Sequence, residues 1–130
     1  MELDALLGAM PFSVASGIEL VSAAPDEVVG RLAWSDERCT VAGVLHGGAL
    51  MTLADSVGAI CAFLNLPEGA GTSTIESKTN FFRAVRAGAV HATARPLHVG
   101  RTTIVVQTDL RDDDERQVAL VIQSQAVLSA

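Results

Sequence analysis

One apolar stretch, from Val44 to Leu64, most restricts the folds that are open to this chain. It reads VLHGGALMTLADSVGAICAFL. Its large apolar side chains recur at the spacing of an α-helix. One stripe of that helix contains Leu50, Leu53, Val57, Ile60 and Leu64. A helix this apolar has to be covered by other elements, so we predict a central helix that begins at Gly47 and packs this stripe against a sheet.

An aspartate interrupts the predicted helix. Asp55 falls on the side of the helix that carries mostly small residues, namely Met51, Thr52, Gly58, Ala59 and Ala62. Burial of a carboxylate costs several kcal/mol unless it is compensated. In one interpretation Asp55 is structural and is satisfied by local hydroxyls or amides, with Thr52 and Ser56 as candidates. In the other it is functional, and the small residues leave room for a second helix or a ligand.

Three residues at the entrance of the helix, His46, Gly47 and Gly48, suggest a second chemical group. A helix N-terminus presents unpaired N–H groups and the positive end of the helix dipole. Glycine allows a ligand to approach that backbone closely. A histidine here could simply cap the helix, but the whole terminus is also suited to hold a developing oxyanion.

The separation of Gly47 and Asp55 decides how they could cooperate. The two residues are eight positions apart, which is about 12 Å along a helix. A nucleophile and an oxyanion donor must both lie within about 3 Å of the reacting group. One helix cannot supply both. Two antiparallel helices in a two-fold dimer could, and would create two sites.

The remainder of the chain is predicted to be mostly strands. We expect a short helix over residues 2–10 that stops near Pro11, a hairpin of strands at 17–24 and 27–34, and a loop at 35–44. Further strands are expected at 73–82, 87–100, 101–111 and 116–128. In the first of these, Ile75, Ser77, Thr79 and Phe81 should share one face. Strands this closely spaced pair antiparallel, so we predict one α+β domain over residues 1–130, with the sheet curled around the helix.

Charge and composition exclude some classes of function. The net charge of −6 argues against general affinity for nucleic acid. The 49% hydrophobic content exceeds what a small core needs and favours a subunit interface. Residues 77–108 contain no acidic residue. That segment carries Lys78, Arg83, Arg86, Arg95 and Arg101. These are either solvated strand charges or an anion site.

The cysteines and the N-terminal residues indicate the cellular compartment in which the protein works. Cys39 and Cys61 form no metal or redox motif, so we expect two reduced thiols, although one disulfide is possible. The N-terminus carries Glu2 and Asp4 without a basic residue, unlike a signal peptide. Polar residues break the long apolar stretch, which argues against a membrane span. We therefore expect a cytoplasmic protein with no membrane partner.

Several segments together resemble a known family. They are LHGGALMTLAD, with the acid nine residues after the histidine, then TIESKTNFFRAVRAG and HVGRTT, and near the N-terminus PFSVASGIELV. The chain resembles the hot-dog-fold acyl-CoA thioesterases over nearly its whole length, and more narrowly the phenylacetate-pathway and 4-hydroxybenzoyl-CoA thioesterase branch. This resemblance implies hydrolysis of an acyl-CoA thioester without a metal or organic cofactor, CoA being part of the substrate. It also implies a homodimer, or a homotetramer built as a dimer of dimers, with active sites across the dimer interface.

The resemblance also implies roles for individual residues. Asp55 would be the catalytic carboxylate, acting as nucleophile or as base on water. The N–H of Gly47 would polarise the thioester carbonyl, His46 would help to position it, and Gly48 would adjoin the substrate. CoA would be contacted by Gly100, Arg101, Thr102 and Thr103. Because arginine binds phosphate well, Arg83 and Arg86 are weaker candidates for the same contact.

The sequence departs from the family pattern at two positions. Thr40 stands six residues before the histidine, where relatives commonly have Asn or Gln. Ala59 stands four residues after the acid, where some relatives have Thr. Thr74 or Ser77 on the next strand could replace that hydroxyl.

Two other functions on the same fold remain open. An enoyl-thioester hydratase needs an acid–histidine pair, but His91 and His98 are distant from Asp55 in the sequence. A non-catalytic acyl-CoA-binding module would need the basic segment and no Asp55. The acyl group itself, whether aryl or short to medium, cannot be read from the sequence.

Overall fold

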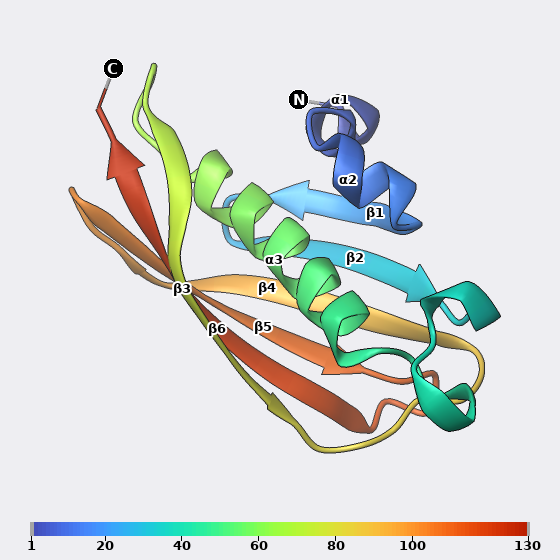
Figure 1. Ribbon diagram of the computed structural model, residues 1–130. Coiled ribbons are helices and arrows are strands. Elements are labelled where there is room, and N and C mark those ends of the chain that lie inside the picture. Colours follow the sequence, from blue (N-terminus) through green and yellow to red (C-terminus); the bar gives the residue numbers. More distant parts are fainter. Residues whose placement is uncertain (1, 130) are drawn as a thin grey trace.

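The computed structural model describes residues 2–129, and its centre is one helix held in a curled sheet (Figure 1). Six strands form a single antiparallel sheet in the order β1-β2-β4-β5-β6-β3. They are β1 (Ile18–Ala24), β2 (Glu27–Ala33), β3 (Gly71–Phe81), β4 (Ala89–Val99), β5 (Thr103–Arg111) and β6 (Gln117–Leu128). The central helix is α3 (Gly47–Leu64). The predicted antiparallel sheet around one helix is confirmed.

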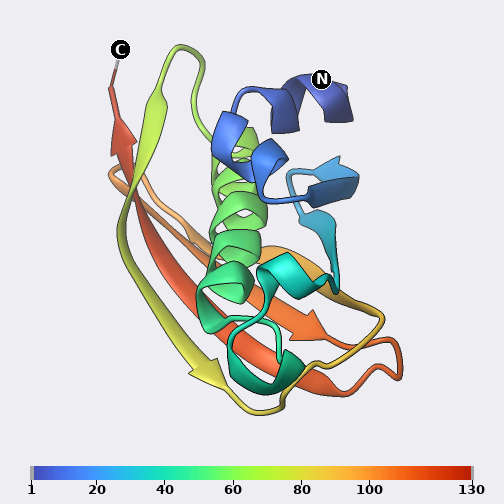
Figure 2. The ribbon, with the colours of Figure 1, turned by 45° about the vertical axis from the view of Figure 1, so that its right-hand side comes forward.

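The predicted apolar stripe of α3 faces the sheet. Leu50, Leu53, Val57 and Ile60 are buried, and Leu64 is partly buried against the same core. By length and apolar composition α3 could cross a membrane. Figures 1 and 2 show that the sheet instead wraps along it, and half of the helix is buried inside the protein. Its role in the core accounts for its composition.

The N-terminal segment differs from the prediction of one helix over residues 2–10. The structure has two short helices, α1 (Leu3–Gly8) and α2 (Pro11–Ala15). Proline has a fixed φ and no N–H, so it can begin a helix as readily as it ends one, and Pro11 does the former. The hydroxyl oxygens of Ser13 and Ser56 lie 2.7 Å apart. This bond fastens α2 to α3. The predicted loop at 35–44 contains two single-turn 3₁₀ helices, at Asp36–Arg38 and Val41–Gly43.

A β-bulge in β3 changes which of its side chains point toward α3. The register against β6 shifts between Thr74 and Glu76. A bulge adds one residue to a strand and moves the alternation of side chains by one position. Thr74 therefore reaches α3, whereas Ile75 is 65% exposed. The prediction that Ile75 shares a face with Ser77, Thr79 and Phe81 is wrong for this reason.

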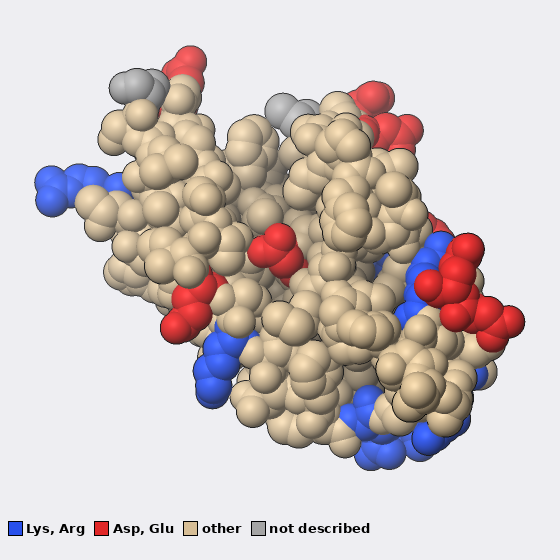
Figure 3. Space-filling view, in the orientation of Figure 1, with Lys and Arg blue, Asp and Glu red and all other residues tan. Residues whose placement is uncertain are grey.

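One side of α3 is left uncovered beside β3. β3 is an edge strand of eleven residues that pairs only with β6. Large apolar side chains stay exposed on or near these elements, namely Phe12, Met51, Ile75, Phe81 and Phe82. Figure 3 shows that most of this hollowed face is uncharged. A long free edge with an apolar patch is typical of an interaction surface.

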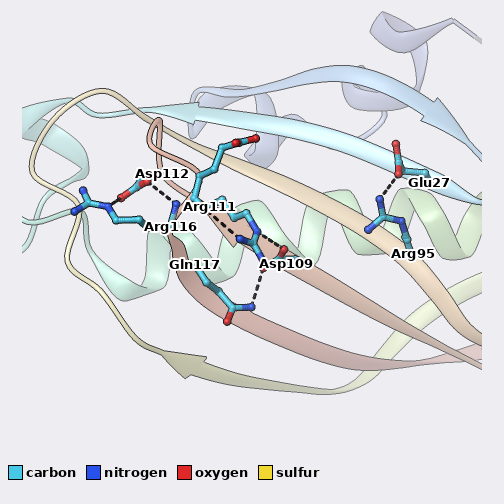
Figure 4. A network of polar contacts seen from close by, with 8 residues as sticks. Glu27, Arg95, Asp109, Arg111, Asp112, Arg116 and Gln117 are labelled. Atoms are coloured by element: carbon cyan, nitrogen blue, oxygen red, sulfur yellow. Dashed lines mark hydrogen bonds and ion pairs between the residues drawn. The ribbon is translucent and has the colours of Figure 1, made fainter.

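The basic residues of segment 77–108 do not form one anion site. Arg95 pairs with Glu27, as Figure 4 shows. Arg83 and Arg86 lie in the loop between β3 and β4, and Arg101 lies in the turn between β4 and β5. Lys78 is exposed on β3. Within one chain these five residues therefore do not form a single cluster.

The two cysteines are free thiols, as predicted. Cys61 is buried and Cys39 is half-buried. Burial, with a smaller contribution from the charge of Asp26, raises the pKa of the Cys61 thiol to about 11. Cys61 is therefore a protonated core residue at neutral pH.

A buried carboxylate holds the turn between β5 and β6. Asp112 accepts hydrogen bonds from the backbone N–H groups of Asp114 and Arg116 and from the Arg116 guanidinium. Figure 4 shows Arg116 beside Asp112. Desolvation acts to raise the pKa of Asp112. The hydrogen bonds outweigh it and hold the pKa below its usual range.

We expect Asp112→Ala to lower the Tm most at neutral pH. A carboxyl whose folded pKa is depressed stabilises the protein above its unfolded pKa, about 3.9. It loses that contribution as the pH falls through the folded value. Thermal unfolding followed by circular dichroism from pH 7 to pH 3 should therefore show the Tm difference from wild type shrinking below about pH 4. Asp114→Ala, which keeps the turn's backbone donors, is the control. A difference that stays constant to pH 3 would contradict this role.

Candidate active site

Asp55 lies midway along α3 on the side that the sheet leaves open. It is exposed in the single chain, so the expectation of a buried carboxylate is wrong for one chain alone. Beside it is a hollow of about 400 Å³ between α2, α3 and β3. Its lining consists of Phe12, Ser13, Met51, Thr52, Asp55, Ser56 and Ser77. The carboxylate is the only charged group in this lining.

Two donors from the sheet hold one oxygen of the Asp55 carboxylate. Thr74 Oγ1 donates to Oδ1 at 3.0 Å, and Gln123 Nε2 donates to the same oxygen at 3.1 Å. Among residues 2–129, no hydrogen-bond donor to Oδ2 is found. The carboxylate is therefore fixed through one oxygen and open at the other.

The hydroxyls that were expected to satisfy Asp55 point elsewhere. Thr52 Oγ1 donates to the Gly48 carbonyl at 2.8 Å, and Ser56 Oγ donates to the Thr52 carbonyl at 2.7 Å. Hydroxyls in a helix commonly bond to the carbonyl four residues before them. The prediction that Thr52 and Ser56 compensate Asp55 is therefore wrong.

A second glutamine supports Thr74. Gln125 Nε2 donates to Thr74 Oγ1 at 2.7 Å. Gln123 and Gln125 are almost completely buried on β6, and the sequence analysis missed both. The signal was the alternation in VIQSQAV, which places them on the face of the buried Val121. Buried amides on an apolar strand need polar partners, and here those partners are Asp55 and Thr74.

The small residues beside Asp55 have separate roles. A Cβ on Gly58 would lie 2.0 Å from Gln123 Oε1, so this glycine makes room for the glutamine rather than for a second helix. Ala59 is half-buried and offers no hydroxyl. Thr74 supplies a hydroxyl to the carboxylate from β3. Ser77 Oγ is buried at the hollow, without a hydrogen-bond partner among the described residues.

His46 caps the N-terminus of α3. Its Nδ1 accepts the N–H of Gly48 at 2.7 Å. Because Nδ1 is an acceptor, the neutral ring carries its proton on Nε2 and can donate a hydrogen bond there. Within residues 2–129, the N–H of Gly47 has no acceptor. The helix start therefore offers an open backbone donor beside a ring that can donate a second bond.

A further hollow of about 330 Å³ adjoins Gly47. Thr40 and Arg83 line it, together with Phe81 and Phe82. The ring of Phe81 approaches Gly47 so closely that a Cβ there would lie 3.2 Å from its Cζ. The structure thus brings Thr40 and Arg83 to the Gly47 end of α3.

The residues expected to contact CoA lie at two ends of the molecule. Gly100, Arg101, Thr102 and Thr103 form the turn between β4 and β5, closed by a bond from Gly100 N–H to Thr103 O at 2.9 Å. Figures 1 and 2 show this turn at the opposite end of the sheet from the start of α3. The loop with Arg83 and Arg86 lies near the start of α3. One chain therefore does not gather all the predicted site residues.

The histidines of β4 do not meet Asp55 within the chain. His91 Nε2 lies 2.7 Å from Asp113 Oδ1, and this hydrogen bond holds the pKa of Asp113 below its usual range. His98 lies against Gly100. Within the described chain, neither histidine therefore forms an acid–histidine pair with Asp55, and His91 pairs with Asp113 instead. Among residues 2–129, no group of three or more His, Cys, Asp or Glu residues is placed to hold a metal ion.

Comparison with known protein families shows the family to which the chain belongs. The model of the thioesterase superfamily matches residues 42–119. The chain belongs to this superfamily. It is 30% identical over 113 residues to MT1895 of Mycobacterium tuberculosis, a protein that carries an esterase designation, covering 85% of this chain and 81% of that protein. It is 29% identical over 104 residues to the 1,4-dihydroxy-2-naphthoyl-CoA hydrolase of Listeria monocytogenes, covering 80% and 85%.

Solved thioesterase structures share the fold. The crystal structure of thioesterase HI1161 from Haemophilus influenzae gives a TM-score of 0.93 at 27% identity, covering 99% of this chain and 92% of that one. Mutant Q49A of thioesterase PA1618 from Pseudomonas aeruginosa gives 0.93 at 26% identity, covering 100% and 96%. The predicted hot-dog fold is confirmed, and this thioesterase fold supports thioester hydrolysis in general. Such thioesterases typically work as oligomers.

Two substitutions should separate the capping role of His46 from a role toward substrate. Asparagine is a favoured N-cap, so His46→Asn should keep the Tm close to that of wild type while removing the Nε2 donor. His46→Ala should lose both the helix cap and the Nε2 donor, and the lost cap should lower the free energy of unfolding by about 1 kcal/mol. Denaturant unfolding and thioester turnover would be measured for each. Full activity in the Asn variant would reduce His46 to a cap.

Proposed function

We propose that this protein hydrolyses acyl-CoA thioesters to a free acid and CoA. The observation that carries the proposal is the geometry at Asp55. The carboxylate lies on the uncovered side of α3, its Oδ1 is held by two donors, and its Oδ2 is open beside a hollow. A fixed, accessible carboxylate is what nucleophilic or general-base attack on a thioester needs.

The proposed reaction follows from that placement. Asp55 either attacks the thioester carbon directly, forming an anhydride that water then opens, or removes a proton from an attacking water. In both routes the C–S bond breaks, the thiol of CoA leaves and the carboxylate is regenerated. The Gly47 N–H would bind the carbonyl oxygen as it becomes negative, with His46 positioning the group. This chemistry requires no metal or organic cofactor.

We place the active site between two chains. Gly47 and Asp55 are about 12 Å apart on one helix, and the fold keeps α3 straight between them. A two-fold axis near Asp55 would set two α3 helices antiparallel, with the start of each beside the Asp55 of the other. The exposed edge of β3 and the uncovered apolar residues support this face as the dimer interface. Pairing of two such dimers would give the expected tetramer.

The same symmetry gathers the proposed CoA contacts. It would bring the turn Gly100–Thr103 of one chain to the end where the partner's α3 begins. Arg101 would then join Arg83 and Arg86 from the other chain around the phosphates, which arginine binds well. The name of the Listeria relative supports an aryl acyl group. We propose aryl or short to medium acyl chains.

Asp55→Asn should reduce kcat for acyl-CoA hydrolysis by at least about 100-fold, because it keeps the shape and removes the nucleophile or base. Release of free thiol would be measured over a panel of aryl, short, medium and long acyl-CoAs. The fold should be retained, since a charge is removed rather than left unpaired. Near-normal turnover would remove Asp55 from the mechanism, and no turnover by wild type with any acyl-CoA would overturn the proposed substrate class.

A mixed-dimer experiment tests the shared site. Gly47→Val should crowd the backbone donor and Asp55→Asn should disable the carboxylate, so each homodimer should be nearly inactive. Co-refolding the two variants in equal amounts should restore about a quarter of wild-type activity. Half of the dimers are then mixed, and each mixed dimer has one intact site. Native mass spectrometry would measure the mixed fraction.

The matched control carries both substitutions in one chain. Co-refolded with wild type, the double variant should also leave about a quarter of the activity if sites are shared, because only wild-type homodimers then work. Sites built within one chain would give no recovery for the two single variants and about half of the activity for the double variant. Shared sites therefore predict equal activities for the two mixtures, whereas sites within one chain predict activity only in the mixture that contains the double variant.

A further inference from the structure

The two oxygens of the Asp55 carboxylate are unequal in this structure. Both donors, Thr74 Oγ1 and Gln123 Nε2, reach Oδ1. Hydrogen bonds to a carboxylate favour its ionised form and fix its plane. The oxygen that they occupy is thereby saturated, and the reacting lone pairs are left on Oδ2. The donors thus select which oxygen can attack.

We infer that Gln123 is a positioning residue, which holds the Asp55 carboxylate turned so that Oδ2 faces the thioester. This inference rests on the proposed function of Asp55 and extends it to β6. The amide nitrogen is a firm donor that cannot reverse its role, whereas a hydroxyl can donate or accept. Gln123 is completely buried, and its position is set by the strand.

Gln125 directs the second donor. Its Nε2 donates to Thr74 Oγ1 at 2.7 Å, so the hydroxyl accepts from behind and its own proton is free to point at Asp55. Thr72 Oγ1 lies 3.1 Å from Gln125 Oε1, and shares its one proton between this oxygen and the Ala126 carbonyl at 2.8 Å. The direction of each bond leads toward Asp55. Two buried glutamines of β6 therefore act on the same carboxylate oxygen.

The surroundings of Gln123 argue against a purely structural role. Its Oε1 is buried without a hydrogen-bond partner among the described residues, which costs stability. Position 58 also carries no side chain, because a Cβ on Gly58 would collide with this oxygen. An apolar side chain at 123 would avoid the first cost. Features that are unfavourable for stability but retained at a site are typical of functional residues.

Among the described residues, Asp55 is the only charged side chain that lines the hollow. α2 contributes Phe12 and Ser13, and β3 contributes Ser77. The donors from β3 and β6 are neutral. A loss of kcat on removing Gln123 is therefore expected to come from the lost amide donor and not from a lost charge.

The decisive variant is Gln123→Met, which conserves volume and removes the donor. We expect kcat for the best acyl-CoA substrate to fall about 10- to 100-fold, the range for a hydrogen bond to a charged group, with KM changed less than threefold. The Tm should stay level or rise, because the unpaired Oε1 is gone.

Two controls make the result specific. Gln117→Met removes another β6 glutamine that donates to an aspartate, at 2.8 Å to Asp109, on the outer face of the sheet; its kinetics should match wild type. Gly58→Ala keeps Gln123 but displaces its amide, and should reproduce the kcat loss. In the Asp55→Asn background, Gln123→Met should cause no further loss, since it acts through Asp55.

Each outcome decides a different claim. Normal kcat in a folded Gln123→Met, with Asp55→Asn inactive, would overturn the positioning role alone. A lowered Tm with unchanged kcat would assign Gln123 to structure. Active Asp55→Asn would instead overturn the proposed function on which the inference rests. Loss of kcat with little change in KM, an undiminished Tm and no further loss in the Asp55→Asn background would establish the positioning role.

Discussion

The burial of one stripe of α3 in the curled sheet is the constraint on which the rest of the structure depends. Leu53 and Val57 are completely buried, and each such side chain contributes about 1.5–3 kcal/mol through burial. Successive helix residues are about 100° apart, so this packing fixes the rotation of the whole helix. Asp55 is thereby held on the open side. Turning the helix to hide Asp55 would expose leucines and bury a charge, and both changes are unfavourable.

The same packing explains why polar residues occur inside β6. Val121 faces the apolar stripe of α3, and two and four residues further along the same strand face come Gln123 and Gln125. At that point the strand passes from the core to the edge of the open side. Gly58 lets the strand and helix stay close there, because no Cβ separates Gln123 from the helix. The border between core and site is therefore marked by complementary residues on two elements.

How much could be predicted from the sequence depends on how far apart in the chain the residues of each feature lie. The helix and most strands depend on local periodicity, and they were predicted correctly with the hot-dog fold. The separation of Gly47 from Asp55 follows from helix geometry alone. The partners of Asp55 were not predicted, because Gln123 is 68 residues away in the chain and only the paired register of β3 and β6 brings it near. The prediction at Pro11 failed for another reason. Proline can either end a helix or begin one, and here it begins α2.

The bulge in β3 joins fold and chemistry most directly. Strict alternation from Phe81 backward through Thr79 and Ser77 would turn Ile75 toward α3 and Thr74 away from it. The carboxylate of Asp55 would then face an isoleucine, with Gln125 deprived of its hydroxyl partner. The bulge adds one residue to the strand, so Thr74 meets Asp55 and Ile75 is exposed. A single irregularity thus supplies a donor to the site and leaves an apolar side chain exposed on the edge strand.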